Sequence, residues 1–177
     1  MQINTVPAYD SSDNPTGCCP RFNPDGWDNQ HLRFQNKLFV RAVTRSEQHV
    51  PIDMGPVFEK TFAAIERAGA YDETNFIVLS RDVSASEAEH YFSVTKPVAG
   101  QDTVTLNGEY LTRVFEGPYE DAPNWEKQFE AQLAEGGHEA ARIFYFYTTC
   151  PKCAQVYGKN FVVAVAELES KQLSLIH

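Results

Sequence analysis

Four aromatic residues follow one another in the segment ARIFYFYTT, residues 141–149. In a β-strand alternate side chains point to opposite faces, so Phe144 and Phe146 share one face. Tyr145 and Tyr147 then share the other. Aromatic rings bury large areas, and a phenol hydroxyl at their rim can orient a ligand. All four could instead be core or sheet-surface residues. We expect one pair to pack on the helices and the tyrosine pair to face a ligand cleft.

Further aromatic residues lie where they could wall the same cleft. The expected ligand-binding residues are Tyr91, Phe115, Tyr119, Trp125 and Tyr145. Together they would enclose a flat, hydrophobic small molecule, which is the partner that the sequence predicts.

Two carboxylates could do acid–base chemistry beside these aromatic residues. Glu116 opens a Gly-Pro-Tyr turn, and Glu89 begins a strand expected near the centre of the sheet. A carboxylate in an aromatic pocket has its pKa raised by desolvation and can act as a general base near neutral pH. Either residue could equally be a solvated surface group or pair with Arg113 or Lys96.

Four cysteines could hold a metal ion. A C-x-x-C turn between two expected strands is half of a typical zinc site, and the adjacent pair in the N-terminal arm would complete it if the arm folds back. The expected ligands of this structural zinc are Cys18, Cys19, Cys150 and Cys153. Reduced thiols, a redox or disulfide role and a catalytic thiol are the alternatives. Thioredoxin-type chemistry needs the first cysteine at a helix N-terminus, whereas a strand is expected here.

The elements that would position these residues occur in the same order in two halves of the chain. The first half predicts a strand at 37–45, a helix at 52–69 and strands at 74–80 and 90–98; the second predicts a strand at 104–117, a helix at 121–137 and strands at 141–149 and 160–168. The helices also match in sequence at an offset of 67 residues, where Trp125 and Glu126 correspond to Phe58 and Glu59.

This repetition predicts an α+β fold made by tandem duplication of a strand–helix–strand–strand module. Module one would span residues 37–100 and module two residues 101–169, followed by a short C-terminal tail. Two such modules can form one antiparallel sheet with both helices on one face and the ligand cleft on the other. Residues 1–36 lie outside the repeat and predict an irregular arm.

Composition narrows the class of protein. A length of 177 residues fits one domain, and a net charge of −9 without a basic cluster argues against a nucleic-acid partner. No apolar run approaches the roughly 18 residues of a membrane span, and the N-terminus does not read as a signal peptide, so we expect a cytoplasmic monomer or homodimer.

Phosphate-binding, dinucleotide and serine-hydrolase motifs are absent, and no organic cofactor is expected. The five histidines show no metal-ligand spacing and are expected to be structural or solvated.

The element order and the segment FEGPYEDAP, residues 115–123, resemble the gyrase-inhibitor-like (GyrI-like) small-molecule-binding family over roughly residues 37–168. The segments GCCPRFNPDGWD, DMGPVFEKTF, TTCPKCA and GKNFVVA look like stand-alone members labelled as hydrolases. Members of this family often carry an acidic residue on the final strand, where it reaches into the cleft. Here that strand, FVVAVAEL, has no acid before Glu167, and the corresponding strand of the first half carries Glu89 instead.

The resemblance implies a ligand-binding domain, and some members open the strained cyclopropane of DNA-alkylating compounds. Such an opening needs a base that activates water, here Glu116 or Glu89, and a donor that stabilises the phenolate that forms, here Tyr147. The alternative is a non-catalytic protein that sequesters ligands or regulates a partner protein. A zinc-stabilised interaction module is a third hypothesis.

Overall fold

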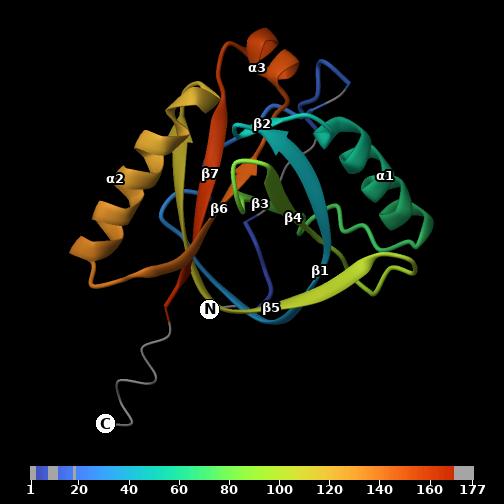
Figure 1. Ribbon diagram of the computed structural model, residues 1–177, viewed down its shortest axis with the longest axis horizontal. Helices are drawn as coiled ribbons and strands as arrows, with labels where there is room; N and C mark the ends of the chain where they lie inside the picture. The colour runs from blue at the N-terminus through green and yellow to red at the C-terminus, as the bar shows by residue number, and fades with distance from the viewer. Residues whose placement is uncertain (1–2, 8–11, 18, 170–177) are drawn as a thin grey trace.

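The computed structural model describes residues 3–7, 12–17 and 19–169 (Figure 1). Its strands are β1 (His31–Glu47), β2 (Val50–Pro51), β3 (Val78–Asp82), β4 (Glu87–Ser93), β5 (Asp102–Glu116), β6 (Ala140–Tyr147) and β7 (Phe161–Leu168). Its helices are α1 (Met54–Arg67), α2 (Ala122–Glu135), α3 (Pro151–Tyr157) and the 3-10 turn η1 (Tyr119–Asp121). The predicted α+β class and antiparallel sheet are confirmed.

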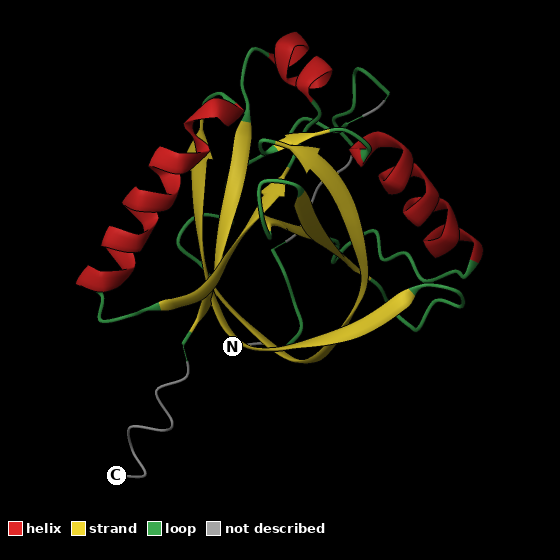
Figure 2. Cartoon of the chain, in the orientation of Figure 1, coloured by secondary structure: helices red, strands yellow, loops and turns green. Residues whose placement is uncertain are grey.

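Antiparallel pairing closes six strands into a barrel, with the helices outside it (Figure 2). The neighbours run β1-β4-β3-β6-β7-β5, and β5 pairs again with β1. Closure is possible because β1 and β5 are 17 and 15 residues long and β1 bends at an irregularity between Phe34 and Lys37. The shortest pairing between neighbouring strands of the barrel is that of β3 with β6, where Ser80 pairs with Tyr145. We call this pairing the β3–β6 seam.

The barrel interior is a packed aromatic core, and this corrects the expected position of the cleft. The face opposite the helices was expected to be open, but closure of the sheet turns it inward. Phe144 and Phe146 point into this interior, where Tyr91 lies 5.7 Å from Phe144, edge to face. Phe22 and Trp27 of the N-terminal arm fill the remaining space against Phe146. Tyr91, expected to bind ligand, is therefore a core residue with 6% exposure.

Both long helices pack on the outer face of the barrel. Helix α1 buries Ile65 and Ala64 against Val40 and Phe92, while α2 covers β5 and β7. Apolar residues at helical spacing explain these contacts, since each helix has one apolar stripe. Helix α1 ends as predicted, because Gly69 adopts a φ of 64° that favours glycine. The helices thus lie on either side of the β3–β6 seam (Figure 1).

The N-terminal arm is irregular, yet it belongs to the core. Strand β1 begins at His31, so the expected boundary between residues 36 and 37 lies inside this strand. Ile3 bridges to Arg33 in parallel, and Trp27 has no exposed surface. In the part of the chain that the structure describes, no helix has both the length and the apolar character to cross a membrane.

Candidate functional site

A broad groove of about 2170 Å³ lies on the outer face of the barrel, over the β3–β6 seam. Its lining includes Phe58 and Phe62 of α1, Ser80 and Asp82 of β3, Tyr145 and Tyr147 of β6, and Glu126 and Glu130 of α2. Ligand sites usually measure about 300–1,000 Å³, so this groove has room for a large polycyclic molecule.

Three of the expected aromatic residues meet at the groove. Tyr147 stacks on Tyr145 with ring centroids 6.2 Å apart and meets Tyr119 edge to face at 5.6 Å. They lie on the side of the helices, because the alternation that sends Phe144 and Phe146 inward sends both tyrosines of β6 outward. Burial raises the pKa of Tyr119 and of Tyr147 to about 12. Their hydroxyls are therefore protonated at neutral pH.

The hydroxyl of Tyr145 is the least satisfied group in this cluster. The residue is 9% exposed, and its buried oxygen has no hydrogen-bond partner among the described residues. Tyr119, in contrast, donates to the carbonyl oxygen of Thr149. Burial raises the pKa of Tyr145, so this hydroxyl is a donor. An unpaired buried polar group costs about 1–3 kcal/mol.

The carboxylate with the raised pKa is one that sequence reasoning missed. Partial burial raises the pKa of Glu126, and the charges of Glu130 and Asp82 raise it further. Glu126 and Glu130 are four residues apart on α2 and share one helix face. The spacing of these two carboxylates could have been recognised in the sequence, whereas the proximity of Asp82 on β3 could not.

Two other expected ligand-binding residues lie beneath α2. Phe115 and Trp125 stack with centroids 5.4 Å apart and an interplanar angle of 12°. Both are buried in the core between α2 and the barrel, at 6% and 5% exposure. Their contacts hold α2 in place at the groove.

The two expected bases lie elsewhere. Glu116 borders a separate shallow depression beside Pro24 and Phe161. Glu89 points into the barrel, is 5% exposed, and lies 2.7 Å from Arg81 and 2.9 Å from Arg41. Burial alone would raise the pKa of Glu89, but the hydrogen bonds and charges of the two arginines outweigh it and lower the pKa. A carboxylate held in this way is a weak proton acceptor.

We predict that Glu89→Gln destabilises the protein by about 2–3 kcal/mol at pH 7, because it leaves two partly buried arginines without their partner. The cost is below that of a fully buried pair, since the side chains of Arg41 and Arg81 are 32% and 30% exposed. Urea denaturation of both proteins measures it. Glu89 has a lowered pKa, so its stabilisation is present above the ordinary value of 4.5 and is lost as the pH falls through the folded-state pKa. The two proteins should therefore converge in acid.

Glu87→Gln is the matched control for this prediction, because Glu87 begins the same strand and is exposed. It should change the stability by less than about 0.5 kcal/mol. Equal effects of the two substitutions would contradict a structural role for the Glu89 ion pairs.

His90 is a structural residue beneath the groove. Its Nδ1 lies 2.7 Å from Ser80 Oγ and its Nε2 lies 2.8 Å from Thr44 Oγ1. Burial lowers the pKa of His90 to about 4, so the ring is neutral and ties β1, β3 and β4 together.

The C-x-x-C segment forms a helix, not the expected hairpin turn. Cys150 is the N-cap of α3, which has proline at its start, and α3 ends at Gly158 with a φ of 72°. The helix is only seven residues long, so its periodicity in the sequence is weak. The expected strand after Cys150 is wrong, because a helix follows this residue and places Cys150 at a helix N-terminus.

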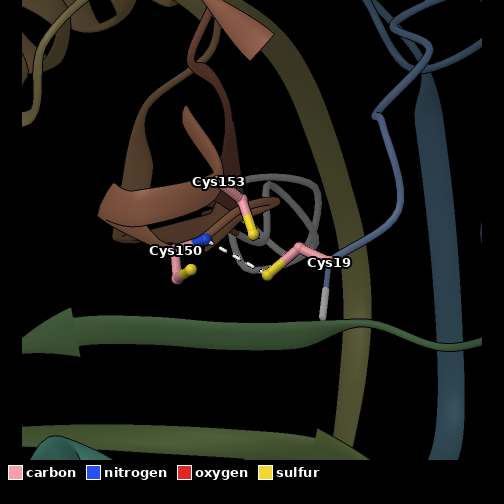
Figure 3. Close-up of side chains that lie close together, drawn as sticks. All are labelled: Cys19, Cys150 and Cys153. Carbon is pink, nitrogen blue, oxygen red and sulfur yellow. Dashed lines mark hydrogen bonds between the residues drawn. The ribbon is translucent and has the colours of Figure 1, made fainter. Parts of the chain in front are cut away.

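Three of the expected metal ligands come together at the start of this helix (Figure 3). The Sγ atoms of Cys19, Cys150 and Cys153 all lie within 4.8 Å of one another, which is close enough to hold a metal ion. Cys150 and Cys153 are free thiols. Cys18 lies outside the described residues. A hydrogen bond with Thr16 is the main cause that lowers the pKa of Cys153 to about 7.

No curated protein matches the chain. The family model described as "Bacterial hydrolase" matches residues 9–168, from the N-terminal arm to the end of β7. This match includes the groove, its tyrosines and the three clustered cysteines, and it shows that the chain belongs to the bacterial hydrolase family.

Proposed function

We propose that this protein is a hydrolase that needs no organic cofactor and opens a strained, flat, hydrophobic electrophile in the groove between α1 and α2. The observation that carries the proposal is the buried, unpaired hydroxyl of Tyr145 beside a carboxylate with a raised pKa, Glu126. Membership of a hydrolase family supports the reaction type. The acidic groups Asp82, Glu126 and Glu130 favour a neutral or cationic substrate.

The proposed reaction is the opening of a cyclopropane conjugated to a ring carbonyl. Glu126 takes a proton from water, and the water oxygen bonds to the outer cyclopropane carbon. The broken C–C bond leaves its electron pair in the ring, so the carbonyl oxygen becomes a phenolate. Tyr145 donates a hydrogen bond to that oxygen, and Tyr147 holds the ligand plane by stacking. The proton on Glu126 then returns to the product.

We also infer that the fold arose by tandem duplication within the GyrI-like architecture. The elements β1, α1, β3 and β4 correspond in order to β5, α2, β6 and β7. The barrel order β1-β4-β3-β6-β7-β5 reads the same from either end when the two modules are exchanged. The β3–β6 seam would then be the pseudo-two-fold axis, with the groove placed over it.

The test is incubation of the purified protein with a cyclopropane-bearing alkylator while the mass of the compound is followed. We expect a gain of one water mass over many turnovers per protein. Tyr145→Phe should slow this reaction by about 100-fold or more, because it removes a donor to the developing charge. Tyr71→Phe is the matched control, since Tyr71 lines another part of the same groove.

Two other outcomes would count against hydrolysis. Tight binding with the compound recovered intact would indicate the non-catalytic, sequestering protein. Failure to bind at all would remove this substrate class and leave the family and the fold.

A further inference from the structure

Two distant segments of the chain bring three sulfur atoms to one point. Cys150 and Cys153 belong to the first turn of α3, and Cys19 approaches from the N-terminal arm (Figure 3). Cys153 is 3% exposed, while Cys19 and Cys150 are half-buried and line one end of the groove. The proposed hydrolytic mechanism uses none of them.

We propose that Cys19, Cys150 and Cys153 bind a zinc ion that fastens the N-terminal arm to α3. Zinc–sulfur bonds of about 2.3 Å in a tetrahedron place sulfur atoms roughly 3.8 Å apart. The three Sγ atoms already lie within 4.8 Å of one another, so small side-chain rotations bring them to this spacing. Each thiol loses its proton to solvent on binding, three thiolates then coordinate the ion, and water takes the fourth position of the tetrahedron.

The surroundings of the sulfur atoms fit a metal site. The backbone N–H of Cys150 donates to Cys19 Sγ at 3.4 Å, and Thr16 Oγ1 lies 3.3 Å from Cys153 Sγ. Zinc sites use such hydrogen bonds to orient their ligands. Tyr157, at the end of α3, donates to the carbonyl oxygen of Cys19 and so holds this ligand in place through its backbone.

The chemistry of the ligands selects the ion. Thiolates favour zinc and other soft ions, whereas Mg²⁺ and Ca²⁺ require oxygen ligands. An ion at this point would link Cys19 of the arm to the connection between β6 and β7. The same arm carries Phe22 and Trp27 into the barrel, so the ion would keep the core closed. This inference does not depend on the reaction in the groove.

The first experiment measures metal content and thermal unfolding of the reduced protein. We expect one zinc ion per chain by atomic emission after reconstitution. Removing the ion with a chelator should lower the melting temperature, and zinc at about 100 times its Kd should raise it again by about 5–10 °C. Mg²⁺ at the same concentration should not restore it.

Substitutions and cobalt identify the ligands. Cys19→Ser, Cys150→Ser and Cys153→Ser should each lose stoichiometric zinc, while Val156→Ala, at an exposed position of α3 that leaves all three sulfur atoms in place, should retain it. Because a variant can fail to fold, the intact protein is also loaded with Co²⁺, which should show sulfur-to-metal charge-transfer absorption. Substoichiometric zinc after reconstitution, a disulfide among these cysteines, or a cobalt spectrum without thiolate bands would overturn the proposal.

Discussion

Replacing Glu126 with glutamine is expected to lower kcat for ring opening by about 10²- to 10⁴-fold at pH 7, with little change in KM. Glutamine keeps the shape of the side chain but cannot accept a proton from water. The substrate would still stack on the tyrosines, so its binding would be largely retained. Steady-state kinetics with the cyclopropane-bearing compound separate the two constants.

The pH profile gives this prediction a second readout. The base works only when deprotonated, so kcat/KM should rise with pH through the pKa of Glu126, which burial and the charges of Glu130 and Asp82 hold above 4.5. Glu130→Gln removes one of these negative charges and lowers the pKa of Glu126. The acid limb of the profile should therefore move to lower pH.

Helix α1 offers a matched control. Glu59→Gln makes the same change on α1, at the position that an offset of 67 residues aligns with Glu126, and should leave kcat unaffected. Glu116→Gln tests one of the two bases expected from the sequence. If Glu116→Gln abolished turnover and Glu126→Gln did not, the groove between the helices would not be the place of the reaction.

The local elements could be read from the sequence, but the closure of the barrel could not. Apolar spacing predicted α1 to within two residues at each end, and strand-like runs predicted β6 and β7. Closure depends on pairing between β1 and β5, whose partners His31 and Leu111 are far apart in the chain. The alternation of side chains along a strand does not predict such pairing, because a strand at the edge of an open sheet would show the same alternation as one paired in a closed barrel.

Contacts between residues far apart in the chain also decide which parts of the candidate site could be predicted. Side-chain alternation along β6 places Tyr145 and Tyr147 on the face opposite to their phenylalanine neighbours. It does not predict which of the two faces packs into the interior of the barrel. The N-terminal arm decides that, because Phe22 and Trp27 occupy the interior. The proton affinity of Glu126 depends on Asp82 of another element. Side-chain alternation was thus predictable, whereas the electrostatics of the groove were not.

The arm also provides the largest expected change in stability. Trp27→Ala should lower the free energy of unfolding by about 3–5 kcal/mol, the usual cost of removing a large buried aromatic side chain. Trp27 has no exposed surface and lies 5.4 Å from Phe146 and 5.7 Å from Phe22, between ring centroids. Urea denaturation, followed by circular dichroism because a tryptophan is lost, measures the change.

The substitution changes the side chain of Trp27 and leaves the backbone hydrogen bonds of the arm in place. The Trp27 carbonyl accepts from Thr112 Oγ1, and the N–H of Asn29 donates to the Thr112 carbonyl at 3.0 Å. The substitution keeps these backbone groups. Val156→Ala, at a side chain that is 69% exposed, should change the stability by less than about 0.5 kcal/mol. If Trp27→Ala cost no more than this control, the arm would be a covering segment. A loss of several kcal/mol would instead make it part of the folding unit, because the barrel would then need the arm to fill its interior.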